Sequence, residues 1–237
     1  MDAKELGAAD VILANPPFGA RAGSARKQRQ DLPFPTANKQ LAFLQHIYLG
    51  LKPGGRAAVV LPDNVLFEDG VGRKVRQDIL ERCNLHTILR LPTGIFYAQG
   101  VMTNVLFFSR GKTEQGNTKA VWIYDMRTGI PAFGRKQPLT LEHFADFEAC
   151  FGADEYGTAK RKDLGKNGRF RKFTRSEIAD RHDNLDITWL RDDIGAAEDA
   201  NTDPSELAVR ISLLLKGAIE QIDLINDQLV LDEDESL

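Results

Sequence analysis

The sequence predicts an α/β domain built on a mostly parallel β-sheet. Short continuous apolar runs, such as Asp10–Ala14 and Arg56–Leu61, have the length and composition of buried strands. Segments with apolar residues at helical spacing alternate with these runs. Strands that alternate with helices are typical of a parallel sheet with helices packed on it.

The expected elements follow one another in a regular order. Proline stops the strand at each Asn-Pro or Leu-Pro step, and Lys52-Pro53-Gly54-Gly55 is expected to end the first helix. The order is strand, helix, strand, helix, strand and a two-stranded hairpin, at Asp10–Ala14, Leu41–Leu51, Arg56–Leu61, Gly72–Cys83, Leu85–Leu91, and Thr103–Ser109 with Ala120–Tyr124.

Three irregular loops follow the expected parallel strands. They are Asn15–Gly19, Pro62–Gly70 and Pro92–Gly100. Because the carboxyl ends of parallel strands share one edge of a sheet, and ligands of open α/β sheets bind there, we expect a functional site at this edge.

The chain divides into three parts by composition. Residues 1–138 hold the sheet, 139–202 are a basic, mixed extension with a short helix capped by Thr140, and 203–237 are a helix with an acidic tail. From residue 198 onward there are eleven acidic and two basic residues, so the net charge of −3 conceals a body of +6. The body holds two basic runs, Lys160–Arg175 and a cluster that is expected to contact DNA, at Arg21, Arg26, Lys27 and Arg29.

The last part has a clear helix start at Asp203-Pro204-Ser205-Glu206, with an N-cap, a proline and a capping-box glutamate. The helix behind it keeps one nearly heptad apolar seam, which packs either on this chain's own core or on the helices of a partner. The seam consists of Leu207, Ile211, Leu214, Ala218, Ile222, Ile225 and Leu229.

Several functional classes are excluded. No stretch approaches the roughly 20 apolar residues of a membrane span, and no leader-like segment opens the chain. Cys83 and Cys150 cannot form a disulfide scaffold and fit a reducing cytoplasm. The sequence predicts no metal site, and His46 and His86 are expected to be structural. Gly70-Val71-Gly72 lacks the third glycine of a dinucleotide fingerprint and follows no strand.

The run Asn15-Pro16-Pro17-Phe18 fits methyl transfer to the exocyclic amine of a planar base. The lone pair of such an amine is delocalised into the ring, so the nitrogen is a poor nucleophile. Two acceptors held against its two hydrogens favour the tetrahedral, nucleophilic geometry. The side-chain oxygen of Asn15 and the rigidly presented carbonyl of Pro16 can be these acceptors. Phe18 offers a face on which an extruded base stacks.

The run Asp10–Gly19 resembles motif IV of amino-group methyltransferases that use S-adenosylmethionine. Further stretches resemble the methylase (modification) subunit of type I restriction–modification systems, an N6-adenine DNA methyltransferase. They are Leu51–Phe67, Ile88–Phe96, Thr103–Phe108 and Asn184–Ile187. The resemblance implies a Rossmann-like methyltransferase fold, a cytoplasmic enzyme that methylates adenine N6 in DNA, and a specificity subunit to which a C-terminal helical region docks. Further modification and restriction subunits complete the assembly.

In that family the glycine-rich cofactor loop lies upstream of motif IV, and here Met1 stands fourteen residues before Asn15. The cofactor-binding residues are therefore unknown, and the chain is expected to be the C-terminal half of the catalytic domain with a helical tail. We expect the isolated chain to be inactive and to bind S-adenosylmethionine weakly. The bare edge of the strand at residues 10–14 is expected to be covered by a second copy, another chain or rearranged segments.

Two alternatives stay open at this point. The chain can be a non-catalytic, truncated module that binds a specificity subunit or DNA. The tetrapeptide at Asn15–Phe18 also occurs in methyltransferases that act on glutamine side chains or RNA bases, since the two-acceptor chemistry serves any planar amine or amide.

Overall fold

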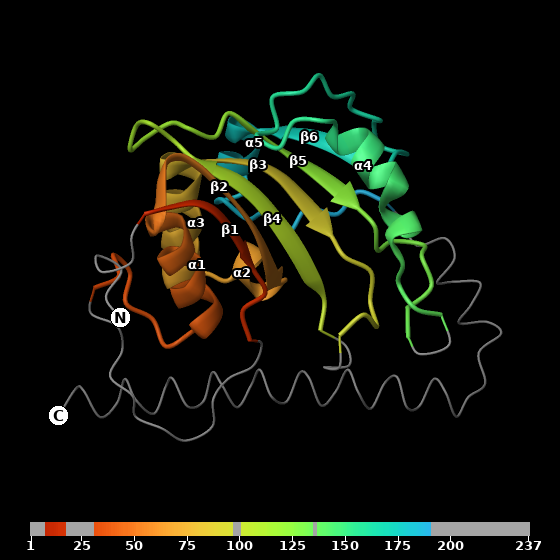
Figure 1. Cartoon of the computed structure of the whole chain (residues 1–237), viewed down its shortest axis with the longest axis horizontal. Coiled ribbons are helices and arrows are strands. Elements are labelled where there is room, and N and C mark those ends of the chain that lie inside the picture. The colour runs from red at the N-terminus through yellow and green to blue at the C-terminus, as the bar shows by residue number, and fades with distance from the viewer. Residues whose placement is uncertain (1–7, 18–30, 97–100, 135–136, 191–237) are drawn as a thin grey trace.

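The centre of the molecule is a six-stranded sheet with helices on both faces (Figure 1). The computed structural model describes residues 8–17, 31–96, 101–134 and 137–190. In these residues the strand order is β1-β2-β4-β3-β5-β6. The strands are β1 (Ala9–Ala14), β2 (Leu51–Pro62), β3 (Cys83–Arg90), β4 (Thr103–Arg110), β5 (Ala120–Asp125) and β6 (Phe170–Thr174).

The sheet is mixed, which corrects the expectation of a mostly parallel one. Strand β1 pairs parallel with β2 and β3 parallel with β5, whereas β4 is antiparallel to both β2 and β3. The predicted hairpin of β4 with β5 is wrong, because β4 inserts between β2 and β3. The connection after β4 packs on the end of the preceding helix, where Thr118 N–H donates to the Leu80 carbonyl, and so delivers β5 to the far side of β3.

Helices α1 (Lys39–Leu49) and α3 (Val71–Arg82) cover one face of the sheet. The side chain of Asn38 starts α1 by accepting from the N–H groups of Gln40 and Leu41. The helix ends earlier than expected, because β2 begins at Leu51. The Pro-Gly-Gly run is a bulge within β2: Gly54 has φ of +83°, and a Cβ on Gly55 would lie 2.8 Å from the Ala9 carbonyl oxygen.

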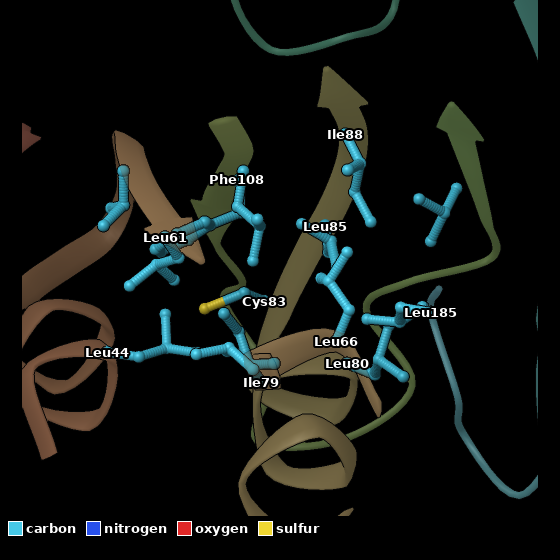
Figure 2. Packing of buried hydrophobic residues seen from close by; sticks show 14 of the residues in the cluster. Leu44, Leu61, Leu66, Ile79, Leu80, Cys83, Leu85, Ile88, Phe108 and Leu185 are labelled. Atoms are coloured by element: carbon cyan, nitrogen blue, oxygen red, sulfur yellow. The ribbon is translucent and has the colours of Figure 1, made fainter. Parts of the chain in front are cut away.

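Aliphatic side chains fill the space between these helices and the sheet. Leu44, Ile79 and Leu80 from the helices meet Leu85 and Phe108 from the strands, as Figure 2 shows. The opposite face is richer in aromatic residues and is covered by α4 (Ala145–Phe151), which follows a short 3₁₀ helix at Leu141–Phe144. The helices on the two faces therefore bury the centre of the sheet on both sides.

The stretch that the sequence predicts as a basic extension contributes to the same sheet. Strand β6 pairs with β5, and α5 (Arg175–Asp180) follows it. The chain then returns across the face that α1 and α3 cover, where Leu185 and Ile187 join the aliphatic core. Within the described residues, 139–190 are therefore packed with 31–134 around one sheet. The predicted tail helix at 203–237 lies outside the described residues.

Candidate functional site

The carboxyl ends of four strands lie at one edge of the sheet. Strands β1 and β2 are parallel, β2 and β3 are both antiparallel to β4, and β5 is parallel to β3. The loops that follow β1, β2 and β3 therefore leave the sheet at the same edge, as the sequence predicts. The second of these loops contains an unpredicted one-turn helix, α2 (Asn64–Phe67), beside the end of β2 (Figure 1).

The corner that follows β1 is open to solvent at its first residue. Ala14 lies opposite Val59 of β2, and the chain then leaves the strand. Asn15 and Pro17 are exposed, whereas Pro16 between them is buried. The exposure of Asn15 leaves the first of the two proposed acceptors accessible to a base. Phe18 and the basic residues Arg21, Arg26, Lys27 and Arg29 lie outside the described residues.

A buried polar network stands at the end of β2. Asp63 is only 8% exposed, and its carboxylate accepts two hydrogen bonds from the Arg127 guanidinium, at 2.7 and 3.0 Å. The fully buried amide of Asn104 donates a third, at 2.7 Å. A forked arginine–carboxylate pair has a fixed geometry as well as a favourable energy. The network therefore gives this corner of the sheet one defined arrangement.

Arg127 extends this network to two neighbouring segments. Its Nε donates to the Leu91 carbonyl at 3.1 Å, and one Nη donates to the Thr103 carbonyl at 2.9 Å. The backbone N–H of Arg127 itself donates to Asp125 at the end of β5. The sequence analysis did not identify these residues. Asp63 lies in the stretch Leu51–Phe67 that resembles the methylase family, but no local pattern marks Arg127 as its partner.

A second contact links this region to the segment before α1. The Glu68 carboxylate accepts from the side-chain amide of Asn38 at 2.7 Å and from that of Asn64 at 3.2 Å. Burial raises the pKa of Glu68, while the two amides act in the opposite direction. Gln45 holds the same segment from α1 by bonding both the N–H and the carbonyl of Phe34. The segment 31–38 is thus tied to α1 and to the residues after β2.

The basic run at 160–175 is largely used for internal contacts. Arg161 stacks on Phe151 and bonds its carbonyl, Arg169 donates to the Asp125 and Thr128 carbonyls, and Arg175 pairs with Asp183 at 2.7 Å. Arg171 lies over the rings of Phe173 and Trp189. Half of the run's eight basic residues therefore stabilise the fold, which reduces the part of this run that is available to contact nucleic acid.

His86 is buried in β3, as expected for a structural histidine. Its Nδ1 lies 2.9 Å from the Thr87 hydroxyl, and its ring packs near Phe151. Burial lowers the pKa of His86 to about 4, with a smaller contribution from the nearby Arg161 charge. The ring is therefore neutral at pH 7.

The outer edge of β1 has no pairing strand among the described residues. Leu13 is 79% exposed and Val11 is 46% exposed on this strand. Two exposed apolar side chains at an open edge form a surface on which another strand or chain can pack. Coverage of this edge by a second copy or another chain stays a prediction.

The described residues lack the features of two other kinds of site. No helix in the ranges given above is long and apolar enough to span a membrane. The same residues hold no cluster of three or more histidine, cysteine or acidic side chains that could bind a metal ion. They also do not form a glycine-rich turn between a strand and a helix, which is the principal cradle for S-adenosylmethionine that the sequence resemblance implies. We therefore assign no cofactor-binding residue.

Comparisons with known proteins agree with this arrangement. The structure is similar to that of the type I restriction enzyme EcoKI M protein, with a TM-score of 0.73, 41% identity, and coverage of 94% of this chain and 50% of that one. It is also similar to a modification subunit of a putative type I restriction enzyme from Vibrio vulnificus, with a TM-score of 0.57, 30% identity, and coverage of 74% and 36%. The described residues thus form a partial methyltransferase fold of the α/β class.

The sequence comparisons are more specific. The chain is 42% identical to the EcoKI methylase subunit of Escherichia coli and to the StySPI methylase subunit of Salmonella potsdam, in each case over 96% of this chain and 48% of the relative. It therefore spans about half the length of the curated relatives that it matches. The family model for N-6 DNA Methylase matches residues 2–196, and the chain belongs to this family.

Proposed function

We propose that the chain is the target-base half of a DNA adenine N6-methyltransferase subunit of a type I restriction–modification system. The observation that carries this proposal is the Asn15 corner: an exposed amide beside a buried proline, at the carboxyl end of a strand and at the edge where three further strands end. Family membership and the named methylase subunits support DNA adenine as the substrate.

In the proposed reaction this chain holds the nucleophile. The Asn15 side-chain oxygen and the Pro16 carbonyl accept hydrogen bonds from the two N–H groups of the adenine amino group. The nitrogen lone pair then becomes available for attack on the methyl group. The charge that develops on the nitrogen as it takes up the methyl group is stabilised by the same two acceptors. Pro17 keeps the corner rigid, and Phe18 stacks on the extruded base. When bound, S-adenosylmethionine would supply the methyl group and leave as the neutral thioether, and the methylated nitrogen would release one proton to solvent.

The proposal includes the partners that the family resemblance implies. DNA, a specificity subunit and further modification and restriction subunits complete the assembly, and Arg21, Arg26, Lys27 and Arg29 contact the DNA. Residues 203–237, which the sequence predicts to begin with a helix, dock on the specificity subunit. The cytoplasm, where the DNA of a restriction–modification host lies, is the proposed location. A pull-down with the specificity subunit, with and without residues 203–237, tests the docking, and added salt separates it from DNA attraction.

The central test is Asn15→Ala in a methyltransferase assembly that contains this chain and transfers methyl groups to its DNA. We expect methyl transfer to fall by about 10²–10³-fold, since one of two acceptors is lost. Incorporation of labelled methyl groups into a recognition-site duplex measures this. Asn84→Ala, at the opposite edge of the sheet, is the matched control and should retain normal turnover. Near-normal turnover of the Asn15 variant would end the proposed role.

The open, apolar outer edge of β1 among the described residues favours a second candidate, a non-catalytic module that binds a partner or DNA. The isolated chain is expected to show no measurable methylation and no tight S-adenosylmethionine binding. Titration calorimetry distinguishes the two cases, because micromolar affinity of the isolated chain for the cofactor would show that it carries the cofactor site itself.

A further inference from the structure

We propose that Asp63 is a positioning residue for methyl transfer, because it fixes the backbone against which the Asn15 corner is held. This inference rests on the proposed function of that corner. Asp63 follows the last residue of β2 directly, and its carboxylate receives three side-chain hydrogen bonds from outside β2. The end of β2 is therefore held by the Asp63 side chain as well as by the backbone hydrogen bonds of β2 to its neighbouring strands.

The side-chain partners of Asp63 come from two other parts of the sheet. Asn104 lies in β4, and Arg127 follows β5. Through the Leu91 and Thr103 carbonyls, Arg127 also holds the end of β3 and the start of β4. The backbone adds a further link, since the Asp63 N–H donates to the Met102 carbonyl at 3.0 Å. The four central strands therefore share one buried junction at the edge where the target loop begins.

Strand β1 depends on β2 for its position. Among the described residues β1 hydrogen-bonds to no other strand, and Ala14 lies opposite Val59, only three residues before the end of β2. The corner at Asn15 and Pro16 therefore continues beside the last residues of β2. A shift of that end moves the one strand that pairs with β1 among the described residues.

The junction also reaches the segment on the other side of residues 18–30. Glu68, five residues after Asp63, bonds the Asn38 side chain that caps α1. The stretch 63–68 thus contacts the chain after the loop through Glu68. It also continues directly from β2, whose residue Val59 lies opposite Ala14 before the loop.

The chemistry makes this placement matter. Two acceptors act on one amino nitrogen only when both lie within hydrogen-bond reach in the correct directions. A displacement of about 1 Å, caused far from the reacting atoms, is enough to cost a large factor in rate. A purely stabilising role for Asp63 would instead lower the melting temperature and leave the turnover of the folded protein unchanged.

The first experiment uses the chain alone and measures hydrogen exchange in the peptide that covers residues 9–15. Asp63→Asn keeps the shape and removes the charge that holds Arg127, while Arg127→Lys keeps the charge and removes the fork. The matched control is Arg110→Lys, which removes the paired hydrogen bonds of another arginine, to the Arg82 carbonyl and Glu114, at the opposite edge of the sheet. We expect about tenfold faster exchange in the peptide for both test variants and no change for the control.

The second experiment measures turnover in the active assembly. We expect kcat to fall about ten- to hundredfold in the Asp63 and Arg127 variants, while the KM for DNA changes less than about threefold. The control should lose melting temperature to a similar extent and keep its kcat. Unchanged exchange at residues 9–15, or a kcat loss equal to that of the control, overturns the positioning role. If Asn15→Ala is inactive and Asp63→Asn is normal, only this inference fails, whereas a fully active Asn15→Ala removes the proposed function itself.

Discussion

Strands β1 and β3 end at the same edge of the sheet, yet their surroundings differ. In β3 every residue except Asn84 is buried, and the strand is paired on both sides, with β4 and β5. In β1 no residue is buried, and β2 is the only strand that pairs with it among the described residues. Strand β1 has one polar residue among six, whereas half of the residues of β3 are polar, so hydrophobicity alone does not predict which strand is buried.

The difference indicates where the sheet is incomplete. Ile12 and Ala14 of β1 pack against the aliphatic core, but Val11 and Leu13 on the other face are exposed. A strand that is apolar on both faces is typical of a sheet covered on both sides. β3 is covered on both faces by described residues, whereas the described residues leave one face and the outer edge of β1 open. The corner for which we propose a chemical role is thus attached to an edge strand without a buried residue.

The largest effect is expected in the centre of the sheet. Ile88 on β3 is fully buried among aliphatic neighbours. Ile88→Ala should lower the free energy of unfolding by about 2–5 kcal/mol, because it removes buried methyl groups and leaves a cavity. Urea titration measures the loss. A cost below that of Leu13→Ala on β1 would contradict the contrast between the two strands.

The stability of the fold should depend on pH through His86 of β3. In the unfolded chain a histidine takes up a proton below about pH 6.5, whereas buried His86 does so only near pH 4. The unfolded state therefore binds more protons between these values, and stability falls as the pH falls through this window, by up to about 3 kcal/mol. Urea midpoints between pH 7 and 4.5 measure it, and His86→Leu should flatten the curve. An equal slope in the variant would assign the loss to carboxylates.

A smaller effect is expected at the start of α1. Asn38→Ala removes the cap of the helix and its link to Glu68. The cost should be about 1 kcal/mol, typical of a lost N-cap. Asn38→Asp restores a capping acceptor but brings a second carboxylate next to Glu68, so it should recover only part of the loss. Full recovery in thermal melts would show that the Glu68 contact contributes nothing.

The smallest effect on the isolated chain is expected on β1. Leu13→Thr should change the unfolding free energy by less than about 0.5 kcal/mol, since the side chain is largely exposed. In an assembly that covers this edge the same change should weaken association clearly. Analytical ultracentrifugation of the chain with its partners measures this, and equal association of wild type and variant would show that the partners bind elsewhere.

Much of the fold follows from local patterns. The alternation of apolar runs and helical spacing places α1, β2, α3 and β3 within a few residues of their observed positions, and Thr140 caps a helical turn as expected. Helix ends were less predictable: the Pro-Gly-Gly run after α1 is a turn signal, but it serves as a bulge in β2 because β1 approaches closely there. The sequence did not predict strand β6, because it is short and rich in basic residues. Only Phe170 and Phe173 are buried, which gives no clear alternation of apolar and polar residues.

By itself the sequence determined the class of fold, the edge at which the loops gather and the Asn-Pro-Pro corner. These are properties of short segments, and the chemistry of an amide next to a proline is local. Only the tertiary structure decided the strand order, the insertion of β4 between β2 and β3, and the junction of Asp63 with Arg127. Residues 64 positions apart meet there because pairing across the sheet brings strand ends together, and no periodicity along the chain records which ends become neighbours.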